Sequence, residues 1–125
     1  DVSYKDFQTG AYEFMPGNDI TLVATGSELE LAVEISKNLK DLSVQIISAP
    51  ILNKINKEKI ESLNLNQNIF TLELGRSTGW DSYIENITRS FSIDSFGESA
   101  PIEALTDRFN FSAKKISDEI RSLLN

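Results

Sequence analysis

The clearest pattern along the chain is an apolar run, an amphipathic segment and a second apolar run. Residues 20–25, Ile-Thr-Leu-Val-Ala-Thr, are β-branched or apolar at both parities, which is typical of a strand covered by helices on both faces. Ser27 with Glu30 three positions later forms a capping box, which predicts a helix running to about Leu39. Residues 44–49 form the second run. The two strands and the helix between them therefore predict a parallel crossover connection.

The predicted helix has one apolar side and one polar side. Its apolar face is expected to hold Leu29, Ala32, Val33 and Ser36, widened by Leu31 and Ile35, while Glu30, Glu34, Lys37 and Asn38 face water. This arrangement is that of a helix lying on a sheet.

Shorter patterns predict the remaining strands and connections. Residues 11–14 favour a short strand, and residues 57–63 favour an amphipathic helix. Residues 69–74 predict a third crossover strand, and residues 80–84 one or two helical turns. Residues 87–93 alternate, with Ile, Arg, Phe and Ile on one parity and Thr, Ser and Ser on the other, which predicts a strand near the sheet edge.

Two helices are predicted to close the chain. Ser99 is expected to cap the first, with Pro101 in its opening turn and Asn110 as a left-handed stop. Ser112 is expected to cap the second. Its apolar stripe is expected to hold Ala113, Ile116, Ile120, Leu123 and Leu124. On its exposed side, Lys114 is expected to pair with Asp118 and Lys115 with Glu119.

Composition narrows the class of protein. The 125 residues suit one domain, and 40% hydrophobic with 25% charged residues is ordinary for a globular fold. Nineteen acidic against 12 basic residues give a net charge of −7, which disfavours nucleic acid and anionic membranes as partners. Because there is no cysteine, disulfides and thiolate chemistry are excluded, and because there is no histidine, proton transfer would need another side chain. We expect a cytoplasmic protein.

The chain is expected to hold a polar arm and one domain. Residues 1–10 are weakly patterned, as a linker from a preceding domain would be, and residues 11–125 form the single core. The chain starts at Asp1, and its one methionine is Met15. This start suits a piece of a larger enzyme, although N-terminal processing of a small protein would give the same start.

The loops at the carboxyl ends of the strands are the places where an open α/β sheet binds ligands. Gly26, Ser27 and Glu28 would place backbone N–H groups at a helix N-terminus, which suits a small anion. Glu28 and Glu30 would oppose that anion, so plain capping is favoured. Arg76 could bind a carboxylate or phosphate at the next strand end, but an ion pair at the surface or between domains is favoured.

Other candidate groups also have a structural interpretation. Trp80 and Tyr83 lie three apart and are candidates for a subunit interface, with core packing as the alternative. Ser99 has no base beside it and is interpreted as a helix cap rather than a nucleophile. The acidic residues lack the spacing of a known metal loop, so no metal ligand is assigned.

Five segments together carry a family resemblance. They are residues 20–32, Ser48-Ala49-Pro50, Glu73-Leu74-Gly75, residues 79–84 (Gly-Trp-Asp-Ser-Tyr-Ile) and residues 96–101 (Phe-Gly-Glu-Ser-Ala-Pro). In this order, across residues 11–124, the chain resembles the C-terminal domain of transketolase, in the thiamine-diphosphate-dependent family.

The resemblance implies an α/β fold with three α/β/α layers and a mixed, mostly parallel five-stranded sheet containing one antiparallel strand. It implies a structural and assembly domain, non-catalytic alone, in a cytoplasmic homodimer of the pentose phosphate pathway. The parent enzyme would transfer a two-carbon ketol unit between ketose and aldose phosphates, using thiamine diphosphate and a divalent cation (Mg or Ca). The preceding domains would hold both, so the resemblance assigns no catalytic, cofactor or metal residue to this chain.

Two alternatives remain open from the sequence. The chain could be a stand-alone module that binds a small anion at the loops beginning with Gly26 and Gly75. It could also be the equivalent domain of deoxyxylulose-phosphate synthase or of a ketoacid dehydrogenase β subunit, although Trp80 and residues 96–101 favour transketolase.

Overall fold

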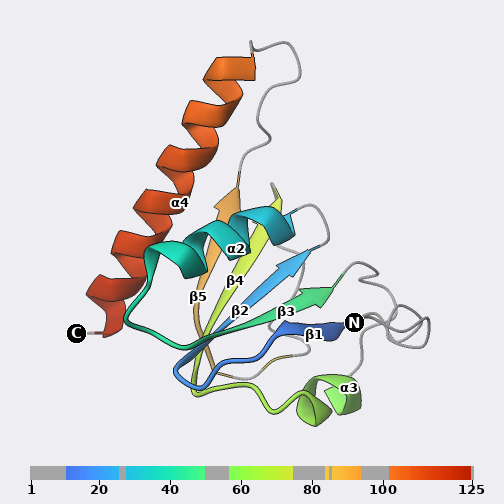
Figure 1. Ribbon diagram of the computed structural model, residues 1–125. Coiled ribbons are helices and arrows are strands. Elements are labelled where there is room, and N and C mark those ends of the chain that lie inside the picture. The colour runs from blue at the N-terminus through green and yellow to red at the C-terminus, as the bar shows by residue number, and fades with distance from the viewer. Residues whose placement is uncertain are drawn as a thin grey trace.

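The fold is a five-stranded sheet with helices on both faces (Figure 1). The computed structural model describes residues 11–25, 28–49, 57–74, 84, 86–93 and 102–124. The strands, in the order β1-β3-β2-β4-β5, are β1 (Tyr12–Met15), β2 (Ile20–Thr25), β3 (Val44–Ala49), β4 (Asn68–Leu74) and β5 (Ile87–Ile93). β1 pairs antiparallel with β3, and every other pairing is parallel. The predicted mixed sheet with one antiparallel strand is confirmed.

Alternate residues of the strands build two separate apolar layers. On one face, Leu22, Ile46 and Phe70 pack beneath the helices α2 (Leu29–Asn38) and α4 (Ile102–Leu124). On the other face, Val23, Ile47 and Ile69 pack with Ile60 of the short helix α3 (Lys57–Ser62) and with Ile84. Neighbouring residues of a strand point to opposite faces, so these clusters are the two sides of an α/β/α sandwich.

The pairing of β4 with β5 contains an irregularity that changes which face β5 residues occupy. Ile69 stands opposite Ile87, but the next residue, Phe70, stands opposite Arg89. Ile87 consequently packs with the α3 layer, whereas Phe91 packs with the α2 and α4 layer. The expected simple alternation through residues 87–93 is therefore wrong at its first position, because an extra residue in a strand moves all later residues of that strand to the opposite face.

A largely buried polar network lies near the amino ends of the parallel strands β2 and β3. The Thr21 hydroxyl donates to Gln45 Oε1 (2.6 Å) and accepts from the Asn66 backbone N–H (2.9 Å). The Gln45 amide donates to Glu13 Oε2 (2.8 Å) and to the Leu63 carbonyl (3.2 Å). Thr21 and Gln45 are 0% and 2% exposed. Since these buried groups bond to one another, the network joins β1, β2, β3 and the α3–β4 connection.

Replacing Thr21 with Val is expected to lower the free energy of unfolding by about 1–3 kcal/mol, because shape is kept while the Asn66 N–H loses its buried acceptor. Urea unfolding followed by circular dichroism measures the loss. The matched control is Thr88→Val on the exposed side of β5, which should change little. Equal effects of the two substitutions would contradict the importance of the network.

The helix α2 begins later than the sequence predicts, and a different set of its residues is buried. Its first residue is Leu29, with Glu28 at the N-cap and no side-chain cap hydrogen bond, while Ser27 of the predicted capping box lies outside the described residues. Its buried residues are Leu31, Ala32 and Ile35, while Leu29, Val33 and Ser36 are half-buried. The buried arc is shifted because α2 contacts α4 as well as the sheet strands β2 and β3.

The two predicted C-terminal helices are one helix, α4, of 23 residues. Asn110 does not stop it, because an interior Asn costs a helix only a few tenths of a kcal/mol and no Pro or Gly interrupts the span. Ala113, Ile116 and Ile120 are buried as predicted, but Leu123 is 45% exposed. Ser117 is buried instead, and its hydroxyl donates to the Ala113 carbonyl (2.7 Å).

Candidate functional site

The carboxyl edge of the parallel strands is the predicted ligand edge, and Glu28 is its one candidate residue within the described part of the chain. Glu28 follows β2, stands at the N-cap of α2 and is 5% exposed. Its side chain makes no cap hydrogen bond to the helix, but a negative charge beside this helix end opposes the binding of an anion there. Gly26, Ser27 and Arg76 lie outside the described residues, so the anion site stays a prediction.

The predicted interface pair also lies outside the described residues. Trp80 and Tyr83 belong to segment 75–83, which the structure does not describe. The next described residue, Ile84, is 3% exposed and packs against the α3 face of the sheet. The assignment of Trp80 and Tyr83 to an interface stays a prediction.

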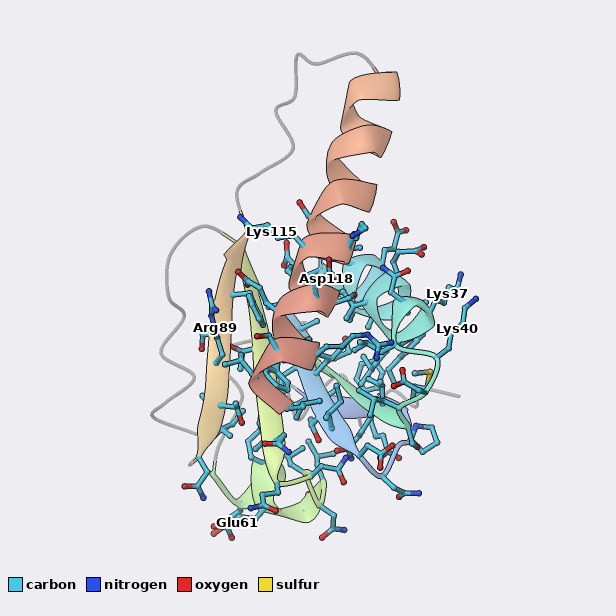
Figure 2. The ribbon with its side chains drawn as sticks, turned by 90° about the vertical axis from the view of Figure 1, so that its left-hand side faces the viewer. Lys37, Lys40, Glu61, Arg89, Lys115 and Asp118 are labelled. Atoms are coloured by element: carbon cyan, nitrogen blue, oxygen red, sulfur yellow. The ribbon has the colours of Figure 1, made fainter. Side chains whose placement is uncertain are left out.

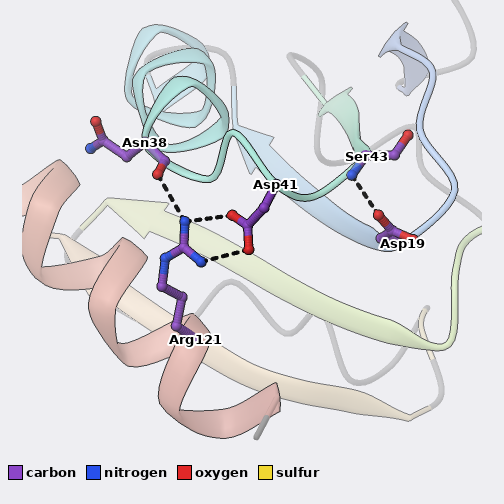
Figure 3. A network of polar contacts seen from close by, with 5 residues as sticks. All are labelled: Asp19, Asn38, Asp41, Ser43 and Arg121. Atoms are coloured by element: carbon purple, nitrogen blue, oxygen red, sulfur yellow. Dashed lines mark hydrogen bonds and ion pairs between the residues drawn. The ribbon is translucent and has the colours of Figure 1, made fainter.

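The best-defined polar cluster holds the end of α4 against the end of α2 (Figure 3). The Arg121 guanidinium donates to both carboxylate oxygens of Asp41, at 2.9 and 2.6 Å, and to the Asn38 carbonyl at 3.2 Å. Asn38 is the last residue of α2, so Arg121 supplies a donor to a carbonyl that the helix leaves unpaired. Beside it, the Ser43 N–H donates to the Asp19 carboxylate (2.6 Å). The bidentate fork links the end of α4 to the turn that follows α2.

The cluster shifts the ionisation of both partners toward the charged forms. The hydrogen bonds from Arg121 lower the pKa of Asp41 below its ordinary value of 3.8, with help from a backbone hydrogen bond. The Asp41 carboxylate raises the pKa of Arg121 above its ordinary value. Both side chains are substantially exposed, so water and salt weaken the pair.

This pair predicts a small acid-sensitive contribution to stability. A lowered carboxyl pKa stabilises the fold fully above the ordinary value of 3.8, and that stabilisation is lost as the pH falls through the lowered pKa. We expect Asp41→Asn to remove this pH dependence below about pH 4 while leaving the profile between pH 5 and 7 unchanged in shape. Thermal unfolding across pH measures it. The control is Glu61→Gln, at an exposed position of α3, which should keep the wild-type profile. If the Asp41→Asn variant also kept the wild-type profile, the assignment would be refuted.

A second contact between distant segments joins α4 to the edge strand β5. The Arg89 guanidinium lies 4.9 Å from the centre of the Phe91 ring and 3.5 Å from the Glu119 carboxylate. Figure 2 shows Arg89 on β5 on one side of α4, with Lys37 and Lys40 on the opposite side of that helix. The predicted pair of Lys115 with Glu119 is thus replaced by an ion pair to β5, whereas Lys114 does pair with Asp118 at 3.0 Å.

An apolar hollow lies between the edge strand β1 and α2. Phe14 is 45% exposed there, and Leu29 and Val33 of α2 line the same hollow, with Glu30, Glu34 and Lys37 also at its wall. Phe14 and Leu123 are the large hydrophobic residues most exposed among those that the structure describes. No sequence pattern indicates this surface, because it forms only when β1 lies beside α2.

Two kinds of site have no support within the described residues. No three His, Cys, Asp or Glu side chains of that part of the chain stand together as metal ligands would. None of its helices has the length and apolar character needed to cross a bilayer.

The fold and these contacts define a helix-covered mixed α/β domain whose described polar side chains mainly hold elements together. The chain belongs to the transketolase-like C-terminal domain family, whose sequence model, described as "Transketolase-like TK C-terminal domain", matches residues 10–112. The resemblance seen in the sequence is confirmed.

The relatives are much longer than this chain. It is 30% identical to the transketolase of Halalkalibacterium halodurans over 135 residues, covering 99% of this chain and 20% of the relative. It is 31% identical to the Bacillus subtilis transketolase over 114 residues, covering 86% and 17%. A crystal structure of Pichia stipitis transketolase in complex with sedoheptulose 7-phosphate superposes with a TM-score of 0.73 at 25% identity, covering 98% of this chain and 19% of that one. The chain thus spans about a fifth of the length of these relatives.

Proposed function

We propose that the chain is the C-terminal structural and assembly domain of a transketolase. The longer polypeptide transfers a two-carbon ketol unit from a ketose phosphate to an aldose phosphate. The observation that carries the proposal is that a C-terminal domain family matches residues 10–112 while the chain covers only 17–20% of transketolase relatives. The sugar phosphate bound to the Pichia stipitis relative supports the substrate class.

The chemistry of this reaction is proposed to lie outside the chain. Thiamine diphosphate supplies carbanion chemistry in such enzymes, and a divalent cation, Mg or Ca, binds its diphosphate. The described residues do not fit either group, since they include no cluster of three metal-ligating side chains and the network at Thr21 and Gln45 is already hydrogen-bonded internally. No reaction step is assigned to the described residues.

The role proposed for this chain is to pack against its neighbours. Residues 1–10 are proposed as the connecting arm and residues 11–125 as the domain. The parent is proposed to be a cytoplasmic homodimer of the pentose phosphate pathway, with Trp80 and Tyr83 at an interface. Replacing both with Ala in the parent should weaken dimerisation in sedimentation experiments, and an unchanged dimer would remove these two residues from the proposal.

The function is tested by comparing two polypeptides. The full-length parent, with thiamine diphosphate and Mg²⁺, is expected to transfer ketol units between ketose and aldose phosphates in a coupled assay. The 125-residue chain alone is expected to show no turnover and, by calorimetry, no binding of thiamine diphosphate. Turnover by the short chain, or none by the parent, would overturn the proposal.

A further inference from the structure

The apolar hollow between β1 and α2 has the features of an interface that another part of a protein covers. Phe14 exposes 45% of its surface, and its neighbours in the hollow, Leu29 and Val33, are only half-buried although both also pack against the core. Burying the rest of these side chains would be favourable in proportion to the apolar area removed from water. A single exposed Phe is ordinary, but an apolar wall shared by a strand and a helix is a surface that a partner can fill.

The size of the relatives indicates which partner this is. The matched transketolases are about five times longer than the segment they share with this chain, and the family is one of C-terminal domains. In a parent of that length, most of the polypeptide lies outside this domain and is available to pack against one of its faces. Phe14 lies on β1, the first described element of the chain and thus the one nearest to that part along the polypeptide. A covalently linked neighbour has a high effective concentration at such a surface.

The charges at the rim restrict the chemistry of the partner. Glu30 and Glu34 stand at the wall of the hollow, with Lys37 as the basic residue among its lining side chains, and the chain carries a net charge of −7. A complementary surface presents an apolar side chain for the hollow with basic residues around it, because like charges at the rim would repel.

We propose that the hollow formed by Phe14, Leu29 and Val33 is where the preceding domain of the same parent polypeptide docks, through an apolar side chain flanked by basic residues. The inference rests on the proposed function only in taking the chain as one domain of a longer protein.

Photo-crosslinking in the full-length parent tests this assignment. A benzoyl-phenylalanine replaces Phe14 in one protein and Leu123 in the control, because the two residues are equally exposed, at 45%, on different elements. Irradiation is expected to link position 14 to peptides upstream of this chain that carry Lys or Arg, whereas position 123 gives no such link. Links from position 14 to residues 1–125, in the same or a second copy, would overturn the proposal, and so would a yield no higher than that of the control.

A second measurement does not depend on the photoprobe. Phe14→Ser in the parent should speed protease cleavage between the domains by roughly fivefold, because the docked state loses the burial of an aromatic side chain. Leu123→Ser is the matched control and should leave the rate unchanged, and equal rates in the two variants would refute the docking site. A ketol-transfer assay on the same samples separates the two ideas, since an inactive parent that still crosslinks sinks only the proposed function.

Discussion

Replacing Phe70 with Ala is expected to lower the free energy of unfolding by about 3–5 kcal/mol. Phe70 has no exposed surface and lies on β4, between β2 and β5. Its ring stacks near that of Phe91, with centroids 6.3 Å apart, and it packs in the cluster beneath α2 and α4. Truncation would leave a cavity at the centre of a face that cannot easily collapse, because neighbouring strands hold its walls.

Chemical denaturation followed by tryptophan fluorescence and circular dichroism measures this loss. The matched control is Phe14→Ala, which removes the same side chain from a position that is 45% exposed, and it should cost less than about 1 kcal/mol in the isolated chain. If the two substitutions cost the same, Phe70 would not occupy the centre of the core.

The second large effect is expected from Gly17→Ala, at about 3 kcal/mol, the upper end of the usual range for overpacking. A Cβ at Gly17 would lie under 3.0 Å from the backbone of β3, against the carbonyl of Val44 and the nitrogen of Gln45. Backbone in a paired strand cannot move aside as the tip of a flexible side chain can. The displaced turn would also lose the bond from the Asn66 amide to the Gly17 carbonyl, now 3.0 Å long.

The neighbouring residue provides the control for this prediction. Asn18 is exposed, and its backbone N–H donates to the Ser43 hydroxyl (3.0 Å), a bond that survives substitution of the side chain. Asn18→Ala should therefore change the unfolding midpoint little. If Gly17→Ala were as mild as Asn18→Ala, the close approach of this turn to β3 would be refuted.

The regular core of the fold can be predicted from the sequence. The runs at 20–25 and 44–49 match β2 and β3 at both ends, because strands buried on both faces carry mostly apolar and β-branched residues at both parities. The shared features of five segments also identified the family correctly.

Local residue preference was misleading where tertiary packing decides the backbone. Asn86 does adopt a left-handed conformation, with φ of 63°, whereas Asn110 was expected to do so and instead continues α4. The shift in register beside Ile69 could not be predicted either, since no residue type near it marks a bulge. In both cases the pairing or packing partner is distant in sequence.

The contacts between elements lie beyond any local pattern. Arg121 and Asp41 are 80 residues apart, and Arg89 meets Glu119 from another strand. No periodicity within a helix connects such positions, so the sequence predicted Lys115 as the partner of Glu119. Among the candidate functional residues, Glu28 is described and buried, while the roles of Gly26, Ser27, Arg76, Trp80 and Tyr83 stay predictions.

The unbroken course of α4 has a mechanical consequence. Its first turns project past the carboxyl ends of the strands, and Arg121 anchors its other end to α2 (Figure 1). At 1.5 Å per residue, 23 residues make a rod about 35 Å long. A sideways force on residue 102 would therefore be transmitted along the helix to the contacts of Arg121, because the helix has no break at Asn110 where it could bend.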